Sequence, residues 1–237
     1  THWRQSVDRE VKTTRESVGI CDVTTLGKID VQGADAAAFL NKVYCNGFAK
    51  LDVGKTRYGL MLREDGIAMD DGTAARFAED HFVVTTTTAN ALSVYRHMEF
   101  VRQVLSPDMD VQLISTTESW AQYAVAGPNA RNLLRKIVDA EFDISNEAFP
   151  FMACGAITVC GGLRARLFRI SFSGELAYEI AVPTRYGDAM IRALVEAGEE
   201  FGGCAYGSEA LGVMRIEKGH AAGNELNGTT TALNLGM

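Results

Sequence analysis

Hydrophobic and polar positions follow two different periods along this chain, and together they predict a mixture of helices and strands. Spacings of three and four residues predict a helix over 34–43, with an apolar face made of Ala36, Phe39, Leu40 and Val43. A strand is predicted immediately before it, in "KIDVQG", and another in the β-branched run "FVVTTTT". A later helix has the apolar face Ala91, Val94, Tyr95, Met98, Val101 and Leu105. Residues 1–18 are charged and polar, and we expect a surface helix or a lead-in segment there.

The same order of elements recurs after residue 118. The stretch "AQYAVAGPNARNLLRKIV" repeats the pattern of "GKIDVQGADAAAFLNKV", with Gly127 in the place of Gly33. "FRISF" takes the place of "TAARF", and "RYGDAMIRALVEAG" supplies the second closing helix. We therefore expect two pseudo-repeats, roughly 25–105 and 119–198, each with the order strand–helix–strands–helix. Identity between the two copies is low, so a shared pattern without duplication stays open as the alternative.

These patterns predict an α+β fold with two pseudo-repeated lobes of mainly antiparallel sheet and helices. The expected domains are residues 1–50 together with 118–237 as a discontinuous first lobe, and residues 51–117 as the second lobe. A ligand cleft is expected between the lobes, because such junctions are favoured binding sites. The last segment begins as a helix and becomes rich in Gly, Asn and Thr, so we expect the chain to be part of a longer polypeptide.

Composition narrows the functional classes. The 237 residues carry a formal net charge of −7, which argues against nucleic acid as the main partner. No signal sequence and no long apolar run is present, so neither secretion nor a membrane partner is expected. Five cysteines without a CxxC pair fit reduced thiols in the cytoplasm. The four histidines match no zinc spacing, so no metal site is expected.

The least ordinary pattern is the acid doublet Asp70–Asp71, which directly follows a short apolar run. The pair Asp65–Gly66 before that run predicts a β-hairpin. Carboxylates are disfavoured in strands and costly to bury without partners, so two in succession need a reason. One reason is a solvent-exposed turn before Gly72. The other is a pocket wall, where an ionised aspartate, with a usual pKa of about 3.9, holds a cationic substrate.

The second copy differs from the first at this place. Ala165 and Arg166 stand opposite the acid doublet, and the second copy carries Glu175 and Glu179 within "SGELAYEIAVP" instead. Judged from the residues alone, Glu179 is best read as a solvent-facing residue of an amphipathic strand.

Five ordered blocks of the sequence resemble a known family. They are "GICDVTTLGKIDVQGADAAAFLNKV", "REDGIAMDDGTA", "AVAGPNARNLL", "SFSGELAYEIAVP" and "EALGVMRIEKGH". Together they resemble the aminomethyltransferase family, to which the glycine-cleavage T-protein belongs. Within the family the resemblance is greatest to the folate-binding C-terminal part of sarcosine oxidase alpha subunits. It covers nearly the whole chain and is far more specific than any single motif.

The resemblance implies a tetrahydrofolate site in the cleft and assigns residues to it. The family's catalytic aspartate falls on Asp71, with Asp70 beside it, and its pterin-binding glutamate falls on Glu179. Further cofactor-binding candidates are Tyr178, Tyr58 and Thr87. Chemistry agrees with this assignment, because a pterin presents two parallel N–H donors that a carboxylate accepts in a bidentate manner. An ionised aspartate also stabilises a methylene-iminium cation.

The implied function is capture of a one-carbon imine on tetrahydrofolate, giving 5,10-methylenetetrahydrofolate, as part of a sarcosine oxidase. The implied partners are a small amine or imine, folate, and the other subunits or domains of that enzyme. A stand-alone aminomethyltransferase, a folate-dependent demethylase and a non-catalytic folate-binding module are the alternatives.

The sequence departs from the family at two places: Leu211 stands where the family has an arginine, and the C-terminal β-barrel of T-proteins is absent from this chain. The FAD-binding region expected in a full sarcosine oxidase alpha subunit is absent too, because no GxGxxG turn follows a strand. FAD is therefore expected only in the rest of a full-length enzyme, and the strength of folate binding is in question.

Overall fold

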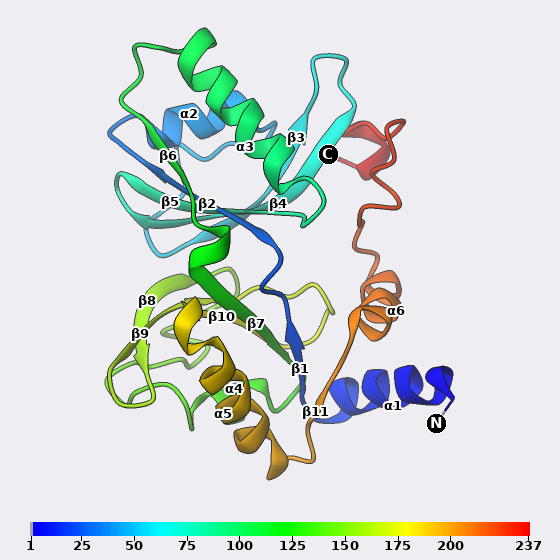
Figure 1. Cartoon of the computed structure of the whole chain (residues 1–237). Coiled ribbons are helices and arrows are strands. Elements are labelled where there is room, and N and C mark those ends of the chain that lie inside the picture. The colour runs from blue at the N-terminus through cyan, green and yellow to red at the C-terminus, as the bar shows by residue number, and fades with distance from the viewer. Residues whose placement is uncertain (1) are drawn as a thin grey trace. The chain divides into compact units, whose positions relative to one another are not determined.

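The computed structural model describes residues 2–237 and divides the chain into two compact units (Figure 1). Unit 1 runs up to Thr24 and again from Ser119 to His220, and unit 2 comprises Thr25–Glu118 and Ala221–Met237. Each unit has its own β-sheet and its own hydrophobic core. The fold is α+β with mainly antiparallel sheets, as the sequence predicted.

The limits of the units differ from the predicted domains. Residues 25–50 lie in unit 2, whereas the sequence placed them with the first lobe. The reason is strand pairing, because β2 (Gly27–Gln32) lies between β5 (His81–Thr86) and β6 (Gln112–Ser115) and bonds to both.

Unit 2 is built on a five-stranded sheet in the order β3-β4-β5-β2-β6. Its remaining strands are β3 (Thr56–Leu62) and β4 (Ala68–Ala78). The helices α2 (Ala36–Val43) and α3 (Ala91–Phe100) lie on one face of the sheet, and a π-helical turn, η1 (Val101–Leu105), continues α3 (Figure 1). Apolar side chains from this face and from the helices form the core, including Ile29, Val31, Phe39, Leu40, Met61, Phe82, Val84, Val94 and Met98.

Unit 1 is built on a six-stranded sheet in the order β11-β1-β7-β10-β9-β8. The strands are β1 (Gly19–Asp22), β7 (Trp120–Ala126), β8 (Cys154–Val159), β9 (Leu163–Phe168), β10 (Ala177–Pro183) and β11 (Cys204–Ala205), with β11 parallel to β1. The helices α4 (Ala130–Leu134) and α5 (Gly187–Glu199) pack on one face, and α1 (Trp3–Glu16) and α6 (Ser208–Lys218) pack near the β1 edge. Three short 3-10 turns occur in the described part of the two units: η2 (Thr117–Ser119), η3 (Thr184–Tyr186) and, in unit 2, η4 (Leu233–Leu235).

The topology of the two units confirms the predicted pseudo-repeat. The order β3-β4-β5-β2 in unit 2 matches β8-β9-β10-β7 in unit 1, and each set has its two helices at equivalent points in the chain. Gly33 and Gly127 occupy equivalent turns with φ of 134° and 127°. At both positions a Cβ atom would fall within 2.5 Å of a backbone carbonyl oxygen, so glycine is required for the same reason twice. The predicted strand "FRISF", residues 168–172, is wrong beyond its first residue, because β9 ends at Phe168 and the chain turns there.

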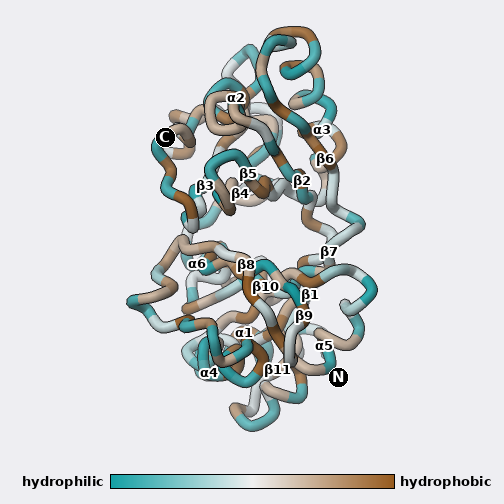
Figure 2. Tube along the Cα trace, turned by 90° about the vertical axis from the view of Figure 1, so that its left-hand side faces the viewer, coloured by the Kyte–Doolittle hydropathy of each residue, from teal (hydrophilic) through white to brown (hydrophobic). Residues whose placement is uncertain are grey.

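Hydropathy follows this architecture. Figure 2 shows hydrophobic stretches along the strands and hydrophilic stretches in many of the loops. Within residues 2–237, no helix is both long enough and apolar enough to cross a membrane.

Candidate functional site

The acid doublet lies in β4, the strand that forms a hairpin with β3. Asp70 pairs with Met61 and Asp71 pairs with Leu60 across the two strands. Successive side chains in a strand point to opposite faces, so the two aspartates have different surroundings. Asp70 shares its face with Met61, which belongs to the helix-covered core. Asp71 projects from the opposite face, and the exposed turn considered from the sequence is therefore wrong.

Asp70 is only 2% exposed and is held by several donors. The Thr87 backbone amide donates to Oδ2 at 3.1 Å, and the Thr87 hydroxyl donates to Oδ1 at 2.6 Å. The Asn90 side-chain amide donates to Oδ1 at 3.1 Å and also to the Met69 carbonyl oxygen at 3.1 Å. Burial raises the pKa of Asp70, and these hydrogen bonds oppose the rise. Asp70 thus fastens β4 to the end of β5 and to the beginning of α3.

Asp71 is partly buried and has far fewer partners. The Tyr58 hydroxyl donates to Asp71 Oδ2 at 3.0 Å. Burial raises the pKa of Asp71 to about 6; the Tyr58 hydrogen bond opposes this rise, and the charge of Asp70 adds to it. Burial and the Asp71 charge also raise the pKa of Tyr58, so its hydroxyl stays protonated. A carboxyl group in this state is suited to proton transfer near neutral pH.

Thr87 and Tyr44 complete the surroundings of the doublet. Because both the amide and the hydroxyl of Thr87 are engaged by Asp70, Thr87 supports the doublet from within the fold. Tyr44 is 8% exposed. Its pKa is raised, mainly by burial and to a smaller extent by the charges of Asp70 and Asp71. The sequence analysis did not identify Tyr44 or Asn90, because helix periodicity carries no information about which carboxylate a side chain approaches.

Glu179 lies on β10 in unit 1 and is 9% exposed, so the solvent-facing interpretation is wrong. It pairs with Ala124 on β7 and with Phe168 on β9. The side-chain amide of Gln122 donates a short hydrogen bond to Glu179 Oε2. Gln122 is itself 1% exposed, and this polar residue within the apolar strand "AQYAVA" is a signal that the sequence analysis missed.

Tyr178 is placed elsewhere. It is fully buried in the core beneath α4 and α5, on the face of β10 opposite Glu179. Its hydroxyl accepts from Arg131 Nε at 2.8 Å, and the Arg169 guanidinium lies over its ring at 5.2 Å. The structure therefore gives Tyr178 a core position instead of the cofactor contact that the resemblance suggested.

Leu211, which the resemblance sets in the place of a family arginine, lies on α6. It packs against a small apolar cluster that includes Cys21 on β1 and Ala177 on β10. Burial raises the pKa of Cys21 to about 11, with contributions from nearby carboxylates including Glu179, so this thiol stays protonated. Leu211 adds apolar contact and no positive charge to this part of unit 1.

Residues 2–237 contain no group of three or more His, Cys, Asp or Glu side chains arranged to hold an ion.

An α+β fold of two such sheet-and-helix units is that of the aminomethyltransferase class. The sequence matches the GCVT N-terminal domain over residues 1–237, and the chain belongs to that family. The structure resembles the glycine cleavage system aminomethyltransferase T from Bartonella henselae, with a TM-score of 0.82 and 26% identity, over 95% of this chain and 58% of that one.

Two similar proteins of known name are sarcosine oxidase alpha subunits. The chain is 58% identical to the sarcosine oxidase subunit alpha of Rhizobium meliloti (strain 1021) over 236 residues, which is 99% of this chain and 24% of that protein. It is 47% identical to the sarcosine oxidase subunit alpha of Corynebacterium sp. (strain P-1) over 98% of this chain, again 24% of that protein. The chain thus spans about a quarter of the length of these relatives. The family resemblance stated from the sequence is confirmed.

Proposed function

We propose that this chain is the tetrahydrofolate-binding part of a sarcosine oxidase alpha subunit, and that it captures a one-carbon imine to give 5,10-methylenetetrahydrofolate. The observation that carries the proposal is the state of Asp71, a carboxyl group with a raised pKa and, among residues 2–237, a single side-chain donor. The resemblance assigns the family's catalytic aspartate to this position. The family match and the similarity to sarcosine oxidase alpha subunits support the same reading.

Glu179 is proposed to bind the pterin. Its carboxylate is buried in the sheet of unit 1, where hydrogen bonds to a charged acceptor are stronger than in water. The Gln122 amide fixes one oxygen and so limits rotation of the carboxylate. A planar ligand with two adjacent N–H donors fits an acceptor held in this way.

Asp71 is proposed to carry the proton chemistry. Tetrahydrofolate supplies the amine nitrogens that take up the one-carbon unit. In its ionised form Asp71 would stabilise positive charge on the imine and accept the proton released by the tetrahydrofolate nitrogen that bonds to the imine carbon. It would return this proton to the original amine nitrogen, which leaves as the second tetrahydrofolate nitrogen bonds to the same carbon. Tyr58 holds the carboxylate in position through Oδ2 and leaves Oδ1 for this transfer. Asp70 acts through the backbone of β4 as a positioning residue.

Titration calorimetry and a formaldehyde-capture assay test these assignments separately. Glu179→Gln is expected to weaken tetrahydrofolate binding more than about tenfold, because pterin donors lose a charged acceptor. Asp71→Asn is expected to bind tetrahydrofolate nearly normally and to lose acceleration of capture. Glu196→Gln, which changes an exposed residue on α5, is the matched control for Glu179→Gln. If Glu179→Gln and Glu196→Gln bind alike, the proposed pterin contact is refuted.

One observation favours a second candidate, a folate-binding module without catalysis. Leu211 supplies no charge where the family has an arginine, which favours weaker or partial engagement of the ligand. In that case Asp71→Asn and the unchanged protein would capture formaldehyde at equal rates. A stand-alone aminomethyltransferase or demethylase would instead be active without further subunits. Under the main proposal, the other sarcosine oxidase subunits or domains are partners, and the flavin belongs to them.

A further inference from the structure

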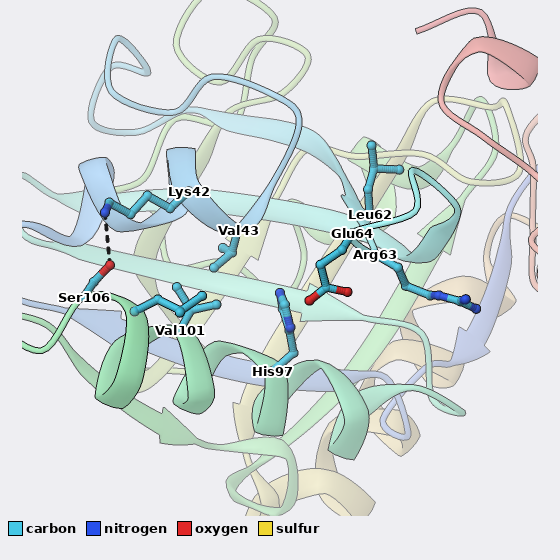
Figure 3. Close-up of a pocket in the computed structure, with 9 residues that line it drawn as sticks. Lys42, Val43, Leu62, Arg63, Glu64, His97, Val101 and Ser106 are labelled. Atoms are coloured by element: carbon cyan, nitrogen blue, oxygen red, sulfur yellow. Dashed lines mark hydrogen bonds between the residues drawn. The ribbon is translucent and has the colours of Figure 1, made fainter.

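Unit 2 contains a cavity of about 290 Å³ that is separate from the surroundings of Asp71. It lies between α2, the β3–β4 hairpin and the end of α3 (Figure 3). Four of its lining side chains are apolar: Val43, Leu62, Val101 and Leu105. The remaining lining residues are polar or charged: Lys42, Arg63, Glu64, His97 and Ser106. A volume near 300 Å³ is at the lower end of the range for small-molecule sites.

The helix that borders the cavity changes its geometry there. α3 passes into the π-helical turn η1, which contributes Val101 and Leu105 to the wall and ends directly before Ser106. π-helical turns are rare and occur frequently at functional sites. The Ser106 side chain is 7% exposed and accepts a hydrogen bond from Lys42 Nζ at 3.0 Å. Its hydroxyl proton is free to be donated to a ligand.

Opposite charges stand at the two ends of the cavity. Lys42 forms no ion pair within residues 2–237, and its hydrogen-bond partner is the neutral Ser106 hydroxyl. Glu64 and His97 lie at the other end in Figure 3, and in the described part of the chain neither takes part in an ion pair. Arg63 is paired with Asp65 and extends away from the others. Lys42 and Glu64 are both exposed at the rim of the cavity. The cavity therefore offers an exposed cation at one end and an exposed carboxylate at the other, with the apolar side chains of Val43 and Val101 between them.

We propose that this cavity binds a small zwitterion whose carboxylate and ammonium are separated by a short unbranched chain, as in an ω-amino acid. Lys42 and Ser106 donate to the carboxylate, Glu64 accepts from the ammonium, and the apolar wall contacts the methylene groups. Pairing at both ends distinguishes this ligand from a simple fatty acid or amine, each of which would pair with only one of the two charges. The inference is independent of the folate proposal, because none of these residues serves that site.

Calorimetry with three probes of equal chain length tests the inference on the intact chain. The probes are 5-aminopentanoate, pentanoate and pentylamine. We expect 5-aminopentanoate to bind at least tenfold more tightly than either single-ended probe. Failure of all three probes to saturate, or equal affinity among them, overturns the proposal without any variant.

Three variants then locate the site. In Lys42→Met, 5-aminopentanoate should no longer bind more tightly than pentylamine. In Glu64→Gln, 5-aminopentanoate should no longer bind more tightly than pentanoate. Lys50→Met changes an exposed lysine of unit 2 outside the cavity, so it should leave all affinities unchanged. An equal effect of Lys42→Met and Lys50→Met would refute the assignment of the carboxylate end.

Discussion

Replacing Asp71 with asparagine is expected to stabilise the fold, because the native carboxylate is held in an unfavourable environment. Burial raises the pKa of Asp71 to about 6, which means that folding disfavours its ionised form. Asparagine is nearly isosteric and neutral, and its side-chain oxygen still accepts the Tyr58 hydroxyl. The variant therefore keeps the hydrogen bond and avoids the cost of burying a charge.

The magnitude follows from the difference between the folded and unfolded pKa of Asp71. A rise from about 3.9 to about 6 is roughly two pH units at 1.36 kcal/mol each, an upper limit of about 3 kcal/mol. Asp71 is only partly buried, so solvent screening reduces the expected gain to about 1–2 kcal/mol. The folded state binds the proton more tightly than the unfolded state. The stabilising contribution of Asp71 is therefore complete below pH 4 and is lost as the pH rises through 6.

Urea unfolding of both proteins at several pH values measures this effect. The advantage of Asp71→Asn should be small near pH 4, grow up to about pH 6 and stay constant above pH 7. Asp70→Asn is the matched control, for which we expect a loss of stability instead of a gain. Its amide group would face a donor of Thr87 or Asn90, and stability should fall by about 1–3 kcal/mol. A loss of stability in Asp71→Asn at pH 8, or a difference that does not vary with pH, would refute the reasoning.

Two further predictions concern the partners of the doublet. Tyr58→Phe removes the hydrogen bond that opposes the rise in the pKa of Asp71, so the pH profile of formaldehyde capture should move to higher pH; an unchanged profile would show that Asp71 does not govern the rate. Thr87→Val removes the hydroxyl donor to Asp70 and should lower the free energy of unfolding by about 1–2 kcal/mol. Thr88→Val is its control in the same unfolding assay, because Thr88 is exposed and shares a hydrogen bond with the exposed hydroxyl of Thr25. An equal loss in both variants would contradict the assigned role of Thr87.

Local signals in the sequence were sufficient for most elements of the fold. Helix periodicity located α2, α3 and α5, and the Asp65–Gly66 pair located the β3–β4 turn. Gly33 and Gly127 marked equivalent turns because each requires a positive φ and close backbone packing. The limits of the units were not predictable in the same way. They depend on β2 bonding to strands that lie about 50 and 80 residues further along the chain, and no local pattern encodes that pairing.

The candidate site was predictable in part. The resemblance supplied Asp71 and Glu179. The sequence analysis also named Tyr178 as a cofactor-binding candidate, although neighbours in a strand point to opposite faces and Tyr178 lies in the core. Gln122 and Asn90 were missed, since the partner of a polar side chain depends on sheet register and on the placement of a helix beside a strand.

The same alternation gives the acid doublet a physical rationale. Two carboxylates on one face would repel each other within a few ångströms, whereas consecutive strand residues point apart. Asp70 is saturated by donors that fasten β4 to α3, and this fixes the backbone from which Asp71 projects. Within the described residues, Asp71 is left with one side-chain donor, and its pKa is raised, an arrangement that costs stability and suits proton transfer. On this reasoning, loosening Asp70 should change the orientation of Asp71 without changing its chemistry, so the two acids contribute to one site through different mechanisms.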